Sequence, residues 1–295
     1  MMSRRTFRSV PACKIMRAYQ IGIYEKGMPA SFSWEEKMLT AKKAGYDFIE
    51  ISIDETDEKL KRLEWTEDER KELRDLMKKT GMPIRSVCLS GHRKYPLGAP
   101  DEKVRARSLE IMEKAIQLAD DLGIRIIQLA GYDVYYEKST PDTVKWFTEN
   151  LIKSAQMAAK YGISMGFETM ETEFMNTVEK AMKYVDIVDS PWLGVYPDIG
   201  NLTNAAKTYN TEVSKDLDTG KGHLMAMHLK ETIPGHFREI PFGTGHVDFE
   251  AGIQKAWDLG VRRFVTEFWD VKDGNWDKEM TNAYTRMTAI LDRMK

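Results

Sequence analysis

Two patterns of hydrophobic residues alternate along the chain. Short apolar runs such as FIEIS (48–52) and IRIIQLA (124–130) are nearly continuous, which is typical of buried strands in a parallel sheet. Between these runs, apolar residues recur at intervals of three and four, which predicts amphipathic helices. One such stripe comprises Ile111, Met112, Ala115, Ile116, Ala119 and Leu122. The alternation of the two patterns predicts repeated strand–helix units.

The expected helices carry boundary signals of their own. Ser33-x-x-Glu36 and Thr66-x-x-Glu69 match the capping box that begins a helix, and Pro141 suits a first helical turn. A glycine separates most helices from the next strand, where a left-handed cap is favoured because glycine has no Cβ. These glycines are Gly45, Gly81, Gly123, Gly162, Gly222 and Gly260.

Strict strand–helix alternation implies a parallel sheet. We expect eight strands, at residues 18–24, 47–52, 84–89, 125–129, 163–168, 193–197, 224–228 and 263–267. Eight such units favour an α/β fold of the (β/α)8 TIM-barrel type, with a single domain over residues 18–295. An open doubly wound sheet is the alternative, but no GxGxxG turn follows the first strand. Residues 1–17 are expected to be an N-terminal extension, either disordered or non-native.

Composition narrows the class of protein. The 295 residues are 42% hydrophobic and 31% charged, with a formal net charge of −2. This balance provides no basic field, so we expect no nucleic-acid partner. No apolar run approaches the roughly 20 residues that span a bilayer, so we expect no membrane partner. The two cysteines, Cys13 and Cys88, are too few for a disulfide framework and fit the reducing cytoplasm.

The candidate chemistry lies at the ends of the last four expected strands. Glu168, Asp198, His228 and Glu267 each close an apolar run, about one strand–helix unit apart. In a barrel the carboxyl ends of all strands face the same mouth, so these side chains should converge. Carboxylate oxygens and one imidazole suit Mn²⁺, Zn²⁺, Co²⁺ or Mg²⁺. We therefore expect one divalent metal ion as the cofactor.

Each of the four residues has a structural explanation when it is taken alone. A strand-end carboxylate is more often a helix cap or an ion-pair partner, and His228 could be a hydrogen-bonded core residue. Three unneutralised carboxylates at one mouth would repel each other, however, and a divalent cation resolves that conflict. The sequence contains no structural-zinc spacing, GxSxG motif or P-loop that would favour another site.

Such a site suits proton transfer on a ketose. A metal that chelates a carbonyl and an adjacent hydroxyl stabilises the enediolate that forms on proton loss. Glu168 and Glu267 lie on the fifth and eighth expected strands, so they could flank the substrate carbon. One glutamate could then remove the proton while the other returns it, and the product would be the epimer.

Longer stretches carry a resemblance to known enzymes. The ordered ligand set resembles that of the xylose-isomerase-like barrel superfamily, and over residues 18–294 the stretches IGIYEKGMP, VCLSGHRKYPLG, YPDIGNL and PFGTGHVDF resemble the bacterial L-ribulose-5-phosphate 3-epimerases. The resemblance implies interconversion of L-xylulose 5-phosphate and L-ribulose 5-phosphate in L-ascorbate or related pentose catabolism. It also implies that Glu168, Asp198, His228 and Glu267 bind the metal, with Glu168 and Glu267 as the catalytic acid/base pair.

The expected substrate contacts are less regular. Free-sugar epimerases of this superfamily have a substrate-binding histidine where this chain has Asn201, and a glutamate where it has Phe174, so the sugar contacts must differ. A phosphate group needs cationic or N–H partners. The candidates are His92, Arg93, Lys230 and Arg238, although each could also be a solvated surface charge. Lys230 would share a strand face with His228 if that strand continues.

Other functions fit parts of the same pattern. Another sugar-phosphate or free-ketose epimerase, for example one for a hexulose 6-phosphate, would use the same ligands. A metal-dependent endonuclease of this superfamily would need more histidines and a basic track. A Schiff-base aldolase could use Lys230 as its nucleophile, and a non-catalytic sugar-phosphate-binding protein would use the glutamates as ligands only. A sugar phosphate is the expected partner, and a homodimer is the default assembly.

Overall fold

The computed structural model describes residues 17–294. Eight parallel strands form one sheet in the order β6-β5-β4-β3-β2-β1-β8-β7. The strands are β1 Gln20–Tyr24, β2 Phe48–Ile53, β3 Ile84–Leu89, β4 Ile126–Ala130, β5 Ser164–Glu168, β6 Leu193–Val195, β7 Met227–Leu229 and β8 Arg263–Thr266. All eight predicted strands are confirmed, although β6 and β7 are shorter than predicted. Of the extension predicted over residues 1–17, only Arg17 is described, and it pairs with Asp47 at 2.7 Å.

The two short strands meet at the seam that closes the sheet. Val195 pairs with Leu224 and Asp198 pairs with His228 in isolated parallel bridges. The His228 amide also donates a hydrogen bond to the Pro197 carbonyl oxygen at 2.9 Å. Closure leaves the sheet without the exposed edges of an open sheet. The predicted fold, a single-domain (β/α)8 TIM barrel, is therefore confirmed.

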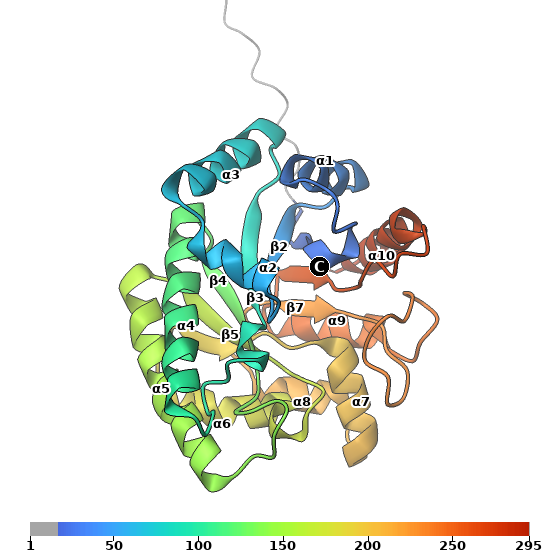
Figure 1. Ribbon diagram of the computed structural model, residues 1–295. Helices are drawn as coiled ribbons and strands as arrows, with labels where there is room; N and C mark the ends of the chain where they lie inside the picture. The colour runs from blue at the N-terminus through green and yellow to red at the C-terminus, as the bar shows by residue number, and fades with distance from the viewer. Residues whose placement is uncertain (1–16, 295) are drawn as a thin grey trace, which may run out of the picture.

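Helices surround the strands on the outside of the barrel (Figure 1). They are α1 Trp34–Ala44, α2 Asp57–Leu60, α3 Glu67–Thr80, α4 Glu102–Leu122, α5 Pro141–Tyr161, α6 Val178–Val188, α7 Ile199–Tyr209, α8 Val213–Thr219, α9 Phe249–Asp258 and α10 Trp276–Leu291. Short 3-10 turns are η1 Glu25–Gly27, η2 Lys61–Glu64, η3 Gly91–Arg93 and η4 Glu173–Met175. The predicted stripe on α4 is buried in the main apolar cluster. Within residues 17–294, no helix combines the length and apolarity that a membrane crossing requires.

The predicted helix boundaries follow local chemistry closely. Ser33 and Thr66 form capping boxes at the starts of α1 and α3. Left-handed glycines cap the ends of α1, α3, α4 and α5, as predicted. Gly222 and Gly260 are also left-handed, but they lie beyond the caps of α8 and α9, which are Gly220 and Leu259. These two glycines therefore shape the turn into the next strand instead of ending a helix.

Inside the barrel, a glycine makes room for a large aromatic ring. A Cβ atom at Gly22 of β1 would lie 2.4 Å from the Phe48 ring of the neighbouring strand β2. Phe48 is fully buried, so its ring has no free space into which it could move. The Phe48 ring thus fills part of the barrel interior in the space that Gly22 leaves open.

We predict that Gly22→Ala lowers the free energy of unfolding by about 1–3 kcal/mol, because the added methyl overpacks a closed interior. Urea unfolding followed by circular dichroism measures this change. Glu113→Ala, at an exposed position of α4, is the matched control and should stay within about 0.5 kcal/mol of the parent protein. A Gly22→Ala protein as stable as the control would contradict the packing argument.

Candidate metal centre and active site

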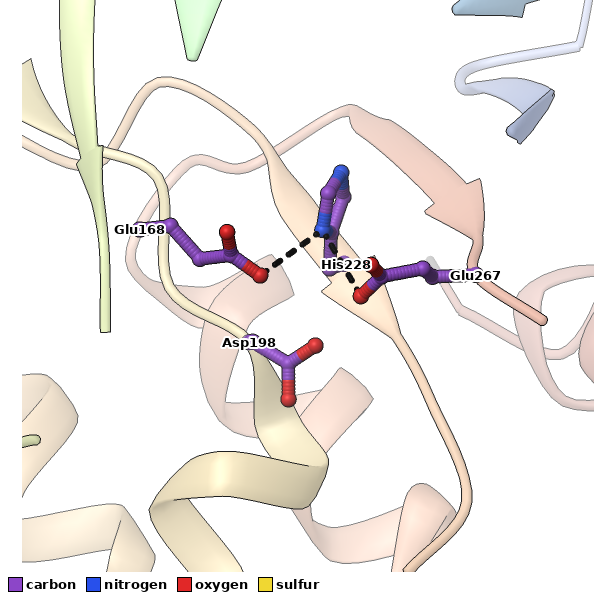
Figure 2. Close-up of side chains that lie close together, drawn as sticks. All are labelled: Glu168, Asp198, His228 and Glu267. Carbon is purple, nitrogen blue, oxygen red and sulfur yellow. Dashed lines mark hydrogen bonds and ion pairs between the residues drawn. The ribbon is translucent and has the colours of Figure 1, made fainter. Parts of the chain in front are cut away.

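The four predicted ligands converge at the carboxyl-terminal mouth of the barrel. Glu168 ends β5, Asp198 caps the start of α7, His228 lies in β7 and Glu267 directly follows β8. Each residue offers one ligand atom, and these atoms all lie within 4.8 Å of one another. In Figure 2, Glu168 and Glu267 approach the centre from opposite sides, with Asp198 and His228 between them. Consecutive strand ends have therefore become one compact cluster.

The cluster is buried, and two of its carboxylate oxygens lack hydrogen bonds. Asp198 and His228 are 0% exposed, and Glu168 and Glu267 are 5% and 6% exposed. Asp198 Oδ2 and Glu267 Oε2 accept no hydrogen bond of good geometry from the residues that the structure describes. Lys230 Nζ lies 3.0 Å from Asp198 Oδ2 and 3.4 Å from Glu267 Oε2, and His228 Nδ1 lies 3.2 Å from Glu267 Oε2. Buried carboxylate oxygens without hydrogen bonds fit a site for a cation.

Crowding shifts the proton affinities of these groups. Burial raises the pKa of Asp198 well above its usual value, and the nearby Glu267 and Glu168 carboxylates raise it further against the opposing charge of Lys230. Burial would also raise the pKa of Glu267, but Lys230 and His228 outweigh it and hold that pKa below its ordinary value. The carboxylates thus compete for the same positive charge, which is the conflict that a divalent ion removes.

The donor set itself fits a divalent metal ion. Three carboxylates and one imidazole are ligands shared by Mn²⁺, Zn²⁺, Co²⁺ and Mg²⁺, so the residues support a metal but do not select one. The predicted grouping of Glu168, Asp198, His228 and Glu267 into one candidate metal site agrees with this geometry.

A fourth buried acid, Glu50, lies directly behind the three carboxylates of the cluster. Glu50 of β2 is 0% exposed, and its Oε1 lies 2.6 Å from His228 Nε2. Its Oε2 accepts hydrogen bonds from Ser86 Oγ at 2.7 Å and from the Tyr196 hydroxyl at 3.0 Å. We did not predict Glu50 as a site residue. The sequence signal was present, because an acid within the apolar run FIEIS must face a polar interior, but nothing in its spacing points to His228.

A cavity beside the candidate ligands is lined by most of the residues that we expect to bind the substrate. Arg93, Lys230, Arg238 and Asn201 all border it, and so do Glu168 and Glu267. Lys26, which we did not predict, also lines this cavity, and it follows β1. The cavity therefore has carboxylates at the metal cluster and several cationic side chains close by.

The two arginines are held at the cavity by different contacts. Arg238 pairs with Glu171 at 2.9 Å, and this ion pair outweighs partial burial and keeps the pKa of the half-buried Glu171 below its ordinary value. The Arg93 guanidinium lies over the Tyr135 ring, 4.6 Å from the ring centroid, and its Nε is buried without a hydrogen-bond partner. Neither is a freely solvated surface charge.

Asn201 is fixed by two hydrogen bonds. Its Nδ2 donates to the Thr169 carbonyl oxygen at 2.7 Å, and its backbone N–H donates to Asp198 Oδ1 at 2.6 Å. Its Oδ1 is buried and has no partner among the described residues. One acceptor of this amide is therefore available to a bound molecule.

His92, also expected to bind the substrate, does not line this cavity. Its side chain is buried in η3, with Nε2 3.1 Å from the Ser108 carbonyl oxygen. Burial lowers the pKa of His92 to about 4, so the ring is uncharged at neutral pH. The structure therefore corrects the placement expected for His92, which connects the loop after β3 to α4.

A larger cavity lies at the other end of the barrel. It has a volume of about 870 Å³ and opens at the opposite, amino-terminal mouth, lined by residues that include Arg17, Gln20 and Arg263. The candidate ligands lie at the carboxyl-terminal mouth, where barrel enzymes carry their chemistry. The candidate active site is therefore distinguished by its ligand side chains and not by the volume of its cavity.

Curated relatives share most of this chain. The L-ribulose-5-phosphate 3-epimerase UlaE of Escherichia coli (strain SMS-3-5 / SECEC) is 46% identical over 250 residues, which cover 84% of this chain and 87% of that protein. The protein of the same name from Shigella boydii serotype 18 (strain CDC 3083-94 / BS512) has the same identity and coverage.

Solved structures share the fold at lower identity. A crystal structure of D-psicose 3-epimerase in the presence of D-fructose has a TM-score of 0.76 and 17% identity, covering 92% of this chain and 99% of that chain. A structure of L-ribulose 3-epimerase has a TM-score of 0.70 and 20% identity, covering 93% of both chains. At these identities the likeness concerns the fold alone. The family model described as a xylose isomerase-like TIM barrel matches residues 39–286. The chain therefore belongs to the xylose isomerase-like TIM-barrel family.

Proposed function

We propose that this protein is a metal-dependent 3-epimerase that interconverts L-xylulose 5-phosphate and L-ribulose 5-phosphate. The observation that carries the proposal is the pair of buried glutamates, Glu168 and Glu267, on opposite sides of one ligand cluster (Figure 2). The 46% identity to curated L-ribulose-5-phosphate 3-epimerases supports the substrate. The same similarity confirms the predicted enzyme class, an isomerase of the carbohydrate-epimerase type.

The two glutamates would perform the proton transfers. A divalent metal held by Glu168, Asp198, His228 and Glu267 would polarise the ketose carbonyl and stabilise the negative charge that develops when the C3 proton leaves. One glutamate removes that proton from one face of C3, and the other returns a proton to the opposite face, which inverts the carbon. The reverse reaction exchanges the two roles.

The cationic side chains would hold the phosphorylated end of the substrate. A phosphate group offers several acceptor oxygens and negative charge, which suit the guanidinium groups of Arg93 and Arg238 and the ammonium group of Lys26. Arg238 is paired with Glu171, so a phosphate that enters the cavity would compete with the Glu171 carboxylate for the Arg238 guanidinium. Asn201 and Lys230 would contact the oxygens nearer the reacting carbon, because both border the ligand cluster.

The contacts of Lys230 argue against a Schiff-base aldolase. Burial opposes the positive charge on Lys230, but Asp198 and Glu267 outweigh it and raise the pKa of the amine above its ordinary value. A nucleophilic lysine must be neutral, and this environment keeps the amine protonated. The metabolic role in L-ascorbate or related pentose catabolism, the cytoplasmic location, the sugar-phosphate partner and the homodimer stay predictions.

We expect metal-dependent exchange at C3. Incubation of the metal-loaded protein with L-xylulose 5-phosphate in D₂O should yield L-ribulose 5-phosphate carrying solvent deuterium at C3, measured by NMR and mass spectrometry. Chelation should abolish turnover and restored Mn²⁺ or Co²⁺ should recover it, because the negative charge formed on proton loss would otherwise be unstabilised. Full turnover after complete metal removal would overturn the proposal.

Glu168→Gln and Glu267→Gln should each lower kcat by about 10²–10⁴-fold, because an amide cannot remove or return the proton. Both variants should unfold near the midpoint of the parent protein. Glu171→Gln, which changes a carboxylate of the same cavity outside the ligand cluster, is the control and should retain most of kcat. Equal losses in all three variants would mean that negative charge alone, and not proton transfer, is required.

Arg93→Ala and Arg238→Ala should each raise KM for the phosphorylated ketose by about 10- to 100-fold, the range expected for a lost charged hydrogen bond. We expect the parent protein to turn over unphosphorylated L-xylulose weakly, and both variants should leave that rate unchanged. Arg125→Ala, which removes a half-exposed arginine side chain just before β4, is the control. Equal losses with both substrates would show that these arginines do not contact the phosphate.

A further inference from the structure

A fully buried polar contact of the barrel interior lies behind His228, the candidate ligand of β7. Glu50 and His228 are both 0% exposed, and 2.6 Å separates Glu50 Oε1 from His228 Nε2. No step of the proposed reaction uses Glu50. A fully buried carboxylate is costly unless its oxygens are hydrogen-bonded, so its retention at this point of β2 needs an explanation.

The bonds of Glu50 fix which histidine nitrogen faces the cluster. Glu50 Oε1 can only accept, so the nitrogen beside it, His228 Nε2, carries the proton. When a metal ion occupies the cluster, the lone pair of the other ring nitrogen, Nδ1, would be available to it. That nitrogen lies 3.2 Å from Glu267 Oε2 and 3.4 Å from Glu168 Oε1, inside the ligand cluster (Figure 2).

Glu50 is itself held from two other strands. Its Oε2 accepts from Ser86 Oγ of β3 and from the Tyr196 hydroxyl, which follows β6. The Tyr196 ring also packs edge-on against the His228 ring, with 4.9 Å between ring centroids. All three neighbours donate, so only a side chain with two acceptor oxygens satisfies them together, and glutamate is such a side chain.

We propose that Glu50 is a positioning residue that sets the tautomer and the orientation of His228 as a metal ligand. It anchors the imidazole through Nε2 and presents Nδ1 to the ion, and it contacts neither the ion nor the substrate. Partners of this kind orient the ligating ring and raise its basicity, and their loss typically weakens metal binding by about 10- to 100-fold. The inference rests on the metal site of the proposed function, and not on the identity of the sugar.

Mn²⁺ binding to the metal-free protein, measured by isothermal titration without substrate, tests this role. Glu50→Leu should weaken Mn²⁺ binding by about 10- to 100-fold, and Glu50→Gln, which keeps one acceptor oxygen, should recover part of that loss. Ser86→Ala is the matched control, because it removes one bond to Glu50 and leaves the Glu50–His228 contact in place. It should lower the unfolding midpoint while changing Mn²⁺ affinity less than twofold.

NMR of the histidine rings in the Zn²⁺-loaded protein provides a readout that does not depend on activity. The loaded parent protein should show a strongly downfield proton on His228 Nε2, as expected for a short hydrogen bond to a carboxylate, and loaded Glu50→Leu should lose that downfield shift. Parent-like Mn²⁺ affinity and a parent-like shift of the Nε2 proton in folded Glu50→Leu would overturn the inference. So would an equal loss of affinity in Ser86→Ala, since it would indicate a general effect of disturbing the interior.

The outcomes separate this inference from the proposed function. A parent protein that binds no Mn²⁺ would overturn the metal site and the role of Glu50 together. A parent protein that binds Mn²⁺ but does not epimerise L-xylulose 5-phosphate would overturn the proposed substrate only. If Glu50→Leu does not fold, Glu50→Gln decides: a severalfold loss of Mn²⁺ affinity at an unchanged unfolding midpoint supports the inference, and an unchanged affinity overturns it.

Discussion

Electrostatic repulsion among buried carboxylates is the constraint on which the rest of this site depends. Glu168, Asp198 and Glu267 meet inside one buried cluster, and Glu50 lies just behind it. Like charges at such separations in a poorly solvated interior cannot all remain ionised without a compensating cation. Lys230 supplies part of that compensation, and a divalent metal ion would supply the rest.

Three of the four ligands meet this constraint in the same way, with one side-chain atom bonded to the scaffold and another facing the cluster. Gln128 Nε2 donates to Glu168 Oε2, so Oε1 is the oxygen that faces His228. Asp198 Oδ1 accepts from the Asn201 amide at the start of α7, and Oδ2 is left without a hydrogen bond. His228 follows the same rule through Glu50. The ligand set is therefore held in place by bonds that do not involve the ion, which keeps its geometry ready before binding.

Much of this was predictable because its causes are local. A capping box needs only Ser33 and Glu36, and a left-handed cap needs only a glycine such as Gly162, so both appear in the sequence itself. The strand-end ligands were predictable for a related reason. In a barrel the strand ends must share one mouth, so a residue that closes an apolar run is placed by topology before any contact is known. The seam was not predictable, because β6 and β7 join through single bridges and not through long strands.

The sequence by itself determined the periodicity, the closed barrel, the four candidate ligands and a family resemblance. Only the tertiary structure decided which polar groups face each other. His92 and Arg93 are neighbours in the chain, yet His92 turns inward to Ser108 and Arg93 turns to the cavity. Glu50 is far from His228 in sequence, and closure of the barrel brings the two together. Periodicity shows which face of its own helix or strand a residue occupies. Which residues meet across the barrel depends instead on how distant strands align when the sheet closes.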